Sequence, residues 1–501
     1  MKQFLMIAGL VSLLCAGVES KSQNEATTSS KRHFKFTIDE IIDLAKNQSP
    51  DGIQAKHAFR ASYWEFRSYK ASFMPSLVFD ATLPDFSRSY KSQWVNESYR
   101  YVQDFSSRIS GSLNVEQSVP LTGGRISIGS SLSRTDVFGT NSSIQYMSSP
   151  VSISYSQSIF GTNQFKWDKK IEPMKYAEAK RKYLKAIENV STVSVRYFFD
   201  LASAQQNVAI AEFNKANNDT LYHMAQGRYN IGNIGENDML QSELNFMNAS
   251  ATLNDALLNL ATSKNRLRSY LGFNESVDIS IIIPEHIPEL QLSLDKIMSL
   301  AKESNPDFMA YQRQIIEAQR NVAVAKANRG FTADIFARFG LDQRGVNINE
   351  AYKNPNDMET VQIGLRIPIL DWGRGRGRVK MAQSNEELVR VQVEQAMSDF
   401  EQNVILQVNQ FNMQGDQYRI TAKADTIAQN RYKVSMQRFL IDKIDITEMN
   451  NAQNDRDAAK QRYITALRNY WTYYYNLRLL TLYDLINNKP LTTDYDSLVD
   501  K

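Results

Sequence analysis

The sequence predicts an α+β protein built from two internal structural repeats, each combining amphipathic strands with very long helices. Three observations predict this fold: a duplicated helical opening, strands that alternate apolar with small polar residues, and two proline-poor helical stretches. An apolar content of 42% in 501 residues is enough to form a sizeable core.

The composition excludes several functional classes. The 58 Lys and Arg against 54 Asp and Glu leave a charge of +4, which is too small to indicate a nucleic-acid partner. One cysteine excludes a disulfide framework, and the four histidines share no metal-ligand spacing, so we expect no metal or other cofactor. No nucleophile elbow, phosphate loop or supported carboxylate pair is present, and we therefore expect no enzyme.

The first twenty residues predict a signal peptide. The apolar run over residues 4–18 is too short for a membrane-spanning helix, and Ser20 suits cleavage after residue 20. Lipidation of Cys15 is the alternative. Residues 21–35 form an N-terminal extension. No later stretch reaches about 18 apolar residues, so we expect the exported chain to be soluble outside the cytoplasm or a membrane β-barrel.

The repeat begins with a helical segment. Residues 36–46 recur as residues 292–302, 256 positions later, and both copies lead into a Ser/Asn-Pro-Asp sequence. Thr37 and Ser293 predict helix N-caps, and the proline of each pair predicts the first position of a second helix.

A second correspondence defines the domain boundaries. Residues 228–239 match 438–449 at an offset of 210, so repeat 1 carries 46 extra residues between the two matched blocks. The chain then divides into repeat 1 (36–271), a linker with two prolines (272–291), repeat 2 (292–487) and a C-terminal tail (488–501).

The predicted strands have one apolar and one small-polar face. A strand of about 10 residues between lipid and a watery lumen requires this pattern, although strands of a soluble sandwich also alternate. The extra residues contain a further hairpin, 109–119 and 126–132 around a Thr-Gly-Gly turn, which leaves four or six strands per chain open. The apolar face is carried by Ile109, Leu113, Val115, Val151, Ile153, Ile335, Phe339, Val361, Ile363 and Leu365.

Two stretches, residues 164–231 and 379–441, predict helical rods of about 100 Å at 1.5 Å per residue. Rods of this length must pair with their return helices and with neighbouring subunits. Residues 373–378 (Gly-Arg-Gly-Arg-Gly-Arg) are interpreted as the linker between the last strand and the second rod. The aromatic run 470–475 is interpreted as packing between helices near the strands. The second rod carries an apolar seam of Val393, Met397, Phe400, Val404, Val408 and Phe411.

In this order of elements, the chain from residue 36 to 485 resembles outer-membrane efflux proteins of the TolC type. The resemblance rests on the duplicated opening, on residues 71–77 (Ala-Ser-Phe-Met-Pro-Ser-Leu) entering the first strand, on residues 368–374 (Pro-Ile-Leu-Asp-Trp-Gly-Arg) leaving the last strand, and on a closing helix over residues 467–485.

The resemblance implies a homotrimer in which strands of three chains close one β-barrel, continued by a long antiparallel α-helical coiled-coil barrel across the periplasm. It implies a passive outer-membrane channel of a tripartite efflux or type I secretion system, which exports small molecules or proteins. Its implied partners are a periplasmic adaptor, an inner-membrane pump of the RND or ABC type, and outer-membrane lipid.

The resemblance also places the two helical hairpin turns at the periplasmic mouth, where they dock the adaptor. The alternative is two ordinary helix–helix loops that use glycine for a left-handed C-cap. The turn residues are Gly232, Asn233, Ile234 and Gly235 in repeat 1 and Asp442, Lys443 and Ile444 in repeat 2.

The family gate is a ring of carboxylates just past the second turn. Glu448 matches its first position, with Asp238 as the counterpart in repeat 1, whereas Asn451 at the second position is not acidic. Phe439 stands where the family can carry a gate tyrosine, and Asp442 replaces the turn glycine. A solvated glutamate on a helix surface is the alternative for Glu448.

The alternative function is a secreted coiled-coil scaffold or adhesin without a pore. Its strands would not need serine-rich faces opposite continuous apolar ones.

Overall fold

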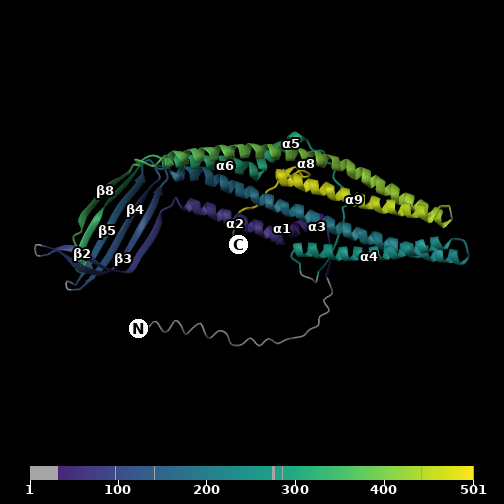
Figure 1. The fold of residues 1–501 in the computed structure, drawn as a ribbon, viewed down its shortest axis with the longest axis horizontal. Coiled ribbons are helices and arrows are strands. Elements are labelled where there is room, and N and C mark those ends of the chain that lie inside the picture. The colour runs from purple at the N-terminus through teal and green to yellow at the C-terminus, as the bar shows by residue number, and fades with distance from the viewer. Residues whose placement is uncertain are drawn as a thin grey trace, which may run out of the picture.

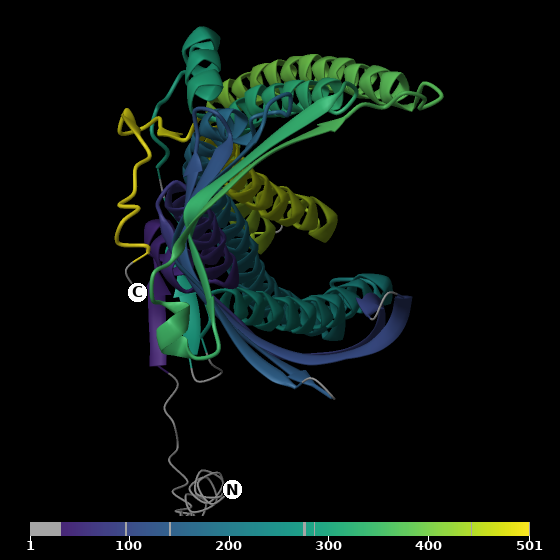
Figure 2. The same ribbon diagram turned by 90° about the vertical axis from the view of Figure 1, so that its left-hand side faces the viewer.

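The computed structural model describes residues 32–95, 98–139, 142–273, 277–284, 286–441 and 443–499. A curved sheet lies at one end, and long helices run from it to two hairpin tips at the other end (Figure 1). Viewed from the sheet end, the chain forms an arc that is open on one side (Figure 2). The predicted signal peptide, Cys15 and Asp442 lie outside the described residues.

The helices confirm the internal duplication, because corresponding helices have almost equal lengths. The pairs contain 11, 22 and 67 residues each, and the return helices contain 35 and 36. They are α1 (Ile38–Gln48) with α5 (Leu294–Ser304), α2 (Pro50–Ala71) with α6 (Pro306–Ala327), α3 (Gln164–Asn230) with α8 (Arg374–Leu440), and α4 (Glu236–Tyr270) with α9 (Ile446–Thr481).

Helix caps follow the sequence in most cases. The Glu40 N–H donates to the Thr37 hydroxyl at 3.4 Å, and the Thr37 N–H donates to the Glu40 carboxylate at 2.8 Å, which completes a capping box. Pro50 and Pro306 start α2 and α6 as predicted. Ser293 occupies the N-cap of α5, but its side chain accepts no capping hydrogen bond.

Six of the described strands form one sheet in the order β2-β3-β4-β5-β7-β8, in which every neighbouring pair is antiparallel. The question of four or six strands is thereby answered in favour of six, because the extra hairpin forms β3–β4 and pairs Val119 with Gly124 at its turn. The strands are β2 (Ser76–Val95), β3 (Ser98–Val119), β4 (Gly124–Phe138), β5 (Ser143–Ser158), β7 (Thr332–Gly345) and β8 (Asn356–Arg366), with the one-turn helix α7 (Ile348–Ala351) between the last two.

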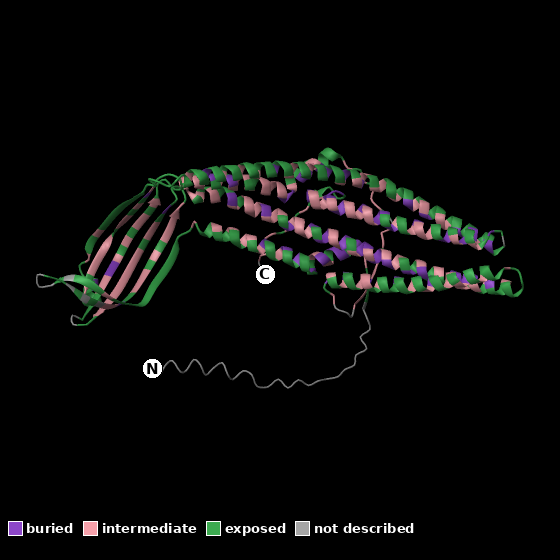
Figure 3. Ribbon diagram, viewed as in Figure 1, coloured by how far each residue is buried: buried purple, intermediate pink, exposed green. Residues whose placement is uncertain are grey.

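The predicted alternation of the strands is confirmed by the register. Ile128 pairs with Val115 and Ile153, and Ile335 pairs with Ile363, so the apolar side chains of neighbouring strands share one face. Serines pair across the other face, as in Ser110 with Ser133. Figure 3 shows that most of the sheet is exposed or half-buried in the single chain. Exposed apolar residues on the shared face include Leu77, Phe79, Ile109, Leu113, Val151, Ile153, Val361, Ile363 and Leu365.

Short polar contacts fix the sheet to the helices. Asn163 caps α3 by accepting from the Lys166 N–H at 3.3 Å, and its amide donates to the Pro120 carbonyl in the β3–β4 turn at 2.9 Å. Asp371 accepts from the N–H groups of Gly373 and Gly375 at 2.9 and 2.8 Å. Because this carboxylate satisfies backbone donors at the helix start, α8 begins at Arg374. The interpretation of residues 373–378 as a linker is therefore wrong beyond Gly373.

The largest core lies midway along the helices. Phe411 and other residues of the predicted α8 seam are buried there against α1, α3, α5 and α9. Tyr470, Tyr474 and Tyr475 are buried in this core, so the predicted packing role of the aromatic run is confirmed, but its predicted position near the strands is wrong. The Tyr470 hydroxyl donates to the Pro288 carbonyl at 2.6 Å, and burial raises its pKa to about 12.

The extension and the linker pair with each other. Strand β1 (Arg32–Phe36) lies parallel to β6 (Val277–Ile281), and His33 contacts the Asp278 carboxylate at 3.0 Å. After α9 the chain forms β9 (Tyr483–Asp484) at the end of repeat 2 and β10 (Lys489–Pro490) in the C-terminal tail, and Tyr495 of the tail packs on Phe59 between α2 and α3. In the part of the chain that the structure describes, no helix is both long and apolar enough to cross a membrane.

Candidate functional site

The two predicted docking turns lie at the hairpin tips, at the end of the molecule farthest from the sheet (Figure 1). They share one backbone geometry. The Asn233 N–H donates to the Arg228 carbonyl and the Lys443 N–H donates to the Arg438 carbonyl, both at 2.9 Å. Gly232 has φ +75°, a left-handed conformation that glycine adopts without strain.

Side chains of the turns differ in exposure. Gly232, Asn233, Gly235 and Lys443 are exposed, and Ile234 is half-buried. Ile444 is only 8% exposed and packs in an apolar cluster that joins the two hairpins near their tips. The buried members of this tip cluster are Leu221, Tyr432, Phe439, Ile444 and Met449.

The three predicted gate residues occupy different environments. Phe439 is buried in the tip cluster, under the guanidinium of Arg228 at 5.7 Å. Glu448 and Asn451 are exposed on the first turns of α9. The Glu448 carboxylate lies 3.9 Å from the Arg438 guanidinium, which partly offsets its charge.

A cavity of about 210 Å³ separates the two turns. Arg228, Ile234 and Asp238 line it from the first hairpin, and Phe439, Ile444 and Asp445 line it from the second. The structure thus brings the two turns and Asp238 together around one small space. Asp445 also caps α9 by accepting from the Glu448 N–H at 2.7 Å.

On the side of the tip cluster that faces the sheet, α3 and α9 contact each other through polar side chains. We call this interface the polar seam. The Asn217 amide donates to Gln453 at 2.9 Å, and the Asn214 amide donates to Asp457 at 2.6 Å. The Arg456 guanidinium donates to the side-chain amide oxygen (Oδ1) of Asn214 at 2.8 Å.

Arg456 contacts both hairpins within the polar seam. Its guanidinium lies 4.4 Å from the ring centres of both Phe213 and Tyr432, which come from α3 and α8. It also pairs with the Asp457 carboxylate at 2.5 Å. Burial raises the pKa of the Tyr432 hydroxyl, although the charge of Arg456 opposes this shift. Arg456 therefore links the first hairpin to both helices of the second.

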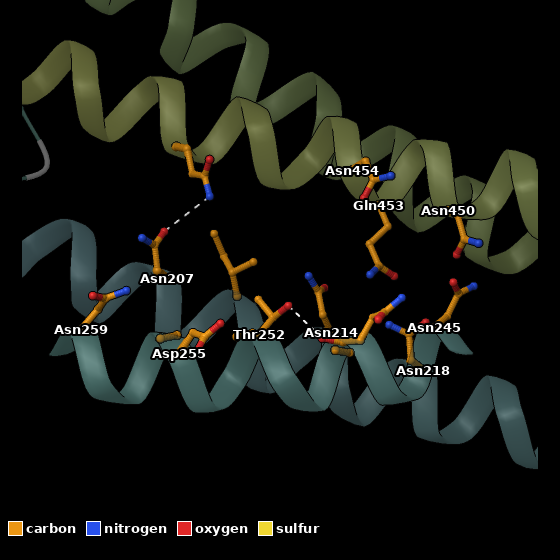
Figure 4. A pocket seen from close by; sticks show the side chains of 16 residues that line it. Asn207, Asn214, Asn218, Asn245, Thr252, Asp255, Asn259, Asn450, Gln453 and Asn454 are labelled. Carbon is orange, nitrogen blue, oxygen red and sulfur yellow. Dashed lines mark hydrogen bonds between the residues drawn. The ribbon is translucent and has the colours of Figure 1, made fainter. Parts of the chain in front are cut away.

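The polar seam borders a cavity of about 480 Å³ lined by α3, α4 and α9. Figure 4 shows amide side chains from all three helices pointing into it. Only one lining residue, Asp255, is charged. Because water can replace amide–amide hydrogen bonds, an interface of this kind separates at a lower free-energy cost than an apolar one. Its amide lining consists of Asn207, Asn214, Asn218, Asn245, Asn248, Asn259, Asn450, Gln453, Asn454 and Gln461.

Sequence reasoning missed the polar seam. The high density of asparagine between residues 207 and 259 and again between 450 and 454 was the available signal, but a single sequence does not show which helices face each other. Among the described residues, no group of three or more His, Cys, Asp or Glu side chains could hold a metal ion.

A family model described as outer membrane efflux protein matches residues 41–273 and 297–481 of the chain. The chain belongs to this family. No curated protein sequence matches the chain.

Solved structures agree with this efflux fold. The Campylobacter jejuni CmeC outer membrane channel is 14% identical with a TM-score of 0.66, and the match covers 92% of this chain and 88% of that one. The outer membrane protein VceC from Vibrio cholerae is 13% identical with a TM-score of 0.64, covering 91% and 97%. A membrane protein from Pseudomonas aeruginosa is 14% identical with a TM-score of 0.66, covering 93% and 92%.

Membership confirms the predicted efflux channel and its place in the outer membrane, with the helices in the periplasm. The family and these neighbours are channel proteins and not enzymes. The alternative of a scaffold without a pore is therefore wrong.

Proposed function

We propose that three copies of this efflux protein form the passive exit duct of a tripartite export system, which carries small molecules or proteins from the periplasm to the exterior. The observation that supports this most is the open sheet. Both of its edges, β2 and β8, have unpaired backbone groups, which lipid cannot satisfy. Because the number of strands is even, β8 of one copy can pair antiparallel with β2 of the next.

Three such sheets would make a barrel of eighteen strands. Barrels of roughly 16–18 strands enclose an aqueous channel. In this proposal the apolar face contacts lipid and the serine-rich face lines the water-filled exit. The narrowest point then lies at the helical tips, and an inner-membrane pump of the RND or ABC type supplies the energy.

The gate, in this proposal, is the second hairpin, which the polar seam holds against the first. Outward rotation of α8 and α9 would separate Asn217 from Gln453 and Asn214 from Arg456, as the iris-like opening of a duct requires. Phe439 stabilises the closed tip from inside, whereas Glu448 and Asn451 face the solvent at the mouth.

The exposed turn residues are the proposed docking surface for a periplasmic adaptor. Gly232, Asn233, Gly235 and Lys443 are accessible at the tips, and Ile234 is half-buried. Ile444 sets the shape of the second turn from the tip cluster.

A photo-crosslinking amino acid at Asn233 should capture a periplasmic adaptor in living cells, because Asn233 is exposed at a tip. Mass spectrometry of the captured protein identifies the adaptor. The same probe at the exposed Asn349, at the sheet end, is the matched control and should not capture it. Capture of the adaptor at both positions, or at neither, would contradict docking at the turns.

Glu448→Gln should lower the preference of the pore for cations over anions. The expected decrease is modest, about two-fold or less, because Arg438 lies 3.9 Å from the Glu448 carboxylate. Reversal potentials in a salt gradient across planar bilayers measure this preference. Glu387→Gln on α8, distant from the tip, is the control. Unchanged selectivity in Glu448→Gln would remove this residue from the mouth of the pore.

A further inference from the structure

The β2–β3 hairpin extends beyond the rest of the sheet. β3 pairs with β4 only as far as Phe105 with Phe138, whereas β2 and β3 continue to pair as far as Val95 with Ser98. Seven residues of β3, 98–104, therefore have β2 as their only described neighbour strand. At about 3.4 Å per residue, the hairpin projects roughly 24 Å past the end of β4. Figure 1 shows it beyond the sheet, at the end opposite the helical tips.

One face of this hairpin is aromatic. The register pairs Trp94 with Tyr99 and Arg88 with Phe105, so these side chains share a face. The exposed fractions of its aromatic residues lie between 61% and 81%, apart from Phe105, which packs on Phe138 with ring centres 4.8 Å apart. We call this surface the aromatic face; it consists of Phe86, Tyr90, Trp94, Tyr99, Tyr101 and Phe105.

The opposite face of the hairpin is polar. Ser87, Ser89 and Lys91 alternate with the aromatic residues along β2. The hairpin is therefore amphipathic across its two strands, and in water its aromatic face would leave a large apolar surface uncovered.

The aromatic face is continuous with the apolar face of the sheet, which contacts lipid in the proposed function on which this inference rests. β3 pairs with β4 without a register shift from Phe105 onward, and the one shift in its pairing with β2, between Thr82 and Asp85, places the extra residue on β2. The alternation along β3 is therefore unbroken, and Tyr99, Tyr101 and Phe105 lie on the same side of β3 as Ile109 and Leu113. The aromatic residues follow the apolar band directly along the strand toward the outer end of the sheet. Tyr and Trp concentrate at the membrane–water interface of barrel strands, at the level of the lipid headgroups.

We propose that the aromatic face of the β2–β3 hairpin lies on the outer leaflet of the outer membrane, with the lipid headgroup region as its partner. The rings of Tyr90, Trp94, Tyr99 and Tyr101 enter the headgroup region, and the serine face points to water. Arg88, on the aromatic face, brings a cation to the level of the lipid phosphates. The hairpin thus extends past the ends of the other strands and anchors the outer mouth of the channel at the membrane surface.

Two serines allow a direct test. Ser92 pairs with Tyr101 and lies on the aromatic face. Ser89, which pairs with Asp104, lies on the polar face of the same hairpin. The natural sequence has one cysteine, Cys15, in the predicted signal peptide, so after removal of that peptide Ser92→Cys and Ser89→Cys each carry one spin label. Power-saturation EPR in lipid bilayers then measures label accessibility to oxygen, which concentrates in lipid, and to a water-soluble nickel complex.

We expect the ratio of oxygen accessibility to nickel accessibility to be several-fold higher for the label at position 92 than for the label at position 89. A label at Asn349→Cys provides the reference ratio for a site fully exposed to water. Equal ratios at Ser92 and Asn349 would overturn the proposal, because the hairpin would then stand in water. Strong dipolar broadening between labels at Ser92 would also overturn it, since the aromatic faces of several copies would then cover one another. Retained conductance of both variants shows that the channel is folded.

Discussion

Arg456→Met should raise the conductance of the channel several-fold, which is the largest functional effect that we expect from a single substitution. Arg456 contacts Phe213 and Asn214 of the first hairpin and Tyr432 of the second, in addition to the direct contact between the two rings, whose centres are 5.8 Å apart. A cation–π contact contributes about 0.5–2 kcal/mol, and a hydrogen bond of a charged group about 1.5–3 kcal/mol. Loss of about 3 kcal/mol from the closed state changes its ratio to the open state by on the order of 100-fold.

Single-channel recording in planar bilayers measures this change, together with sensitivity of cells to large antibiotics that the closed duct excludes. Arg462→Met is the matched control, because Arg462 is exposed on α9, six residues along the same helix. The control should retain the parental conductance. Parental conductance in Arg456→Met would show that the polar seam does not hold the gate closed, while a similar rise in both variants would indicate a general effect of lost charge.

Asn217→Leu should have a smaller effect of the same sign. The substitution removes the 2.9 Å hydrogen bond to Gln453 and leaves a buried amide without its partner. The expected increase in conductance is therefore below that of Arg456→Met. A decrease in conductance would indicate that the leucine strengthens the contact between the hairpins and would weigh against a polar seam that opens easily.

Much of the fold could be predicted because its signals are local in the sequence. Strand alternation, the Pro-Asp helix starts and the long proline-poor stretches depend on neighbouring residues, and the structure contains all three. The start of α8 shows the limit of this approach. The glycines at 375 and 377 indicate a linker by propensity, but the Asp371 carboxylate accepts two backbone N–H groups and lets the helix begin earlier.

The residues that form the site could be predicted only in part, because the site depends on contacts between distant segments. The two turns were found from their repetition, and both lie at the tips. The environment of Phe439 was not predictable, since Leu221, which packs near it, is 218 residues away in the sequence. Arg456 stands in an ordinary Asn-Asp-Arg-Asp sequence, and only the fold places it between two rings.

Arg478→Met should have the largest effect on stability. The Arg478 guanidinium lies in the main core, where it donates to Glu188 at 2.8 Å and to Asp484 at 3.2 Å, and the Tyr474 hydroxyl donates to the same Asp484 at 3.0 Å. The side chains of Glu188 and Asp484 are only 2% and 9% exposed. Removing the cation leaves two buried carboxylates, and the loss of one partner from a buried ion pair costs about 3–5 kcal/mol.

Thermal unfolding in detergent compares Arg478→Met with Arg390→Met; the Arg390 side chain is 49% exposed and pairs with Glu386 within one helix. The control substitution should lower the free energy of unfolding by only about 0.3–0.5 kcal/mol. A similar small decrease in both variants would contradict the assigned role of Arg478.

The dependence of stability on acidic pH provides a second test. Burial raises the pKa of Asp484, but hydrogen bonds from Asn487 and the charge of Arg478 outweigh it and lower the pKa overall. A depressed carboxylate pKa stabilises the fold above the unfolded value and ceases to do so as the pH falls through the folded value. The parental channel should therefore lose this contribution only below about pH 4. In Arg478→Met the hydrogen bonds from Asn487 still lower the pKa of Asp484, but the charge of Arg478 no longer does, so the dependence of stability on pH in that range should be weaker.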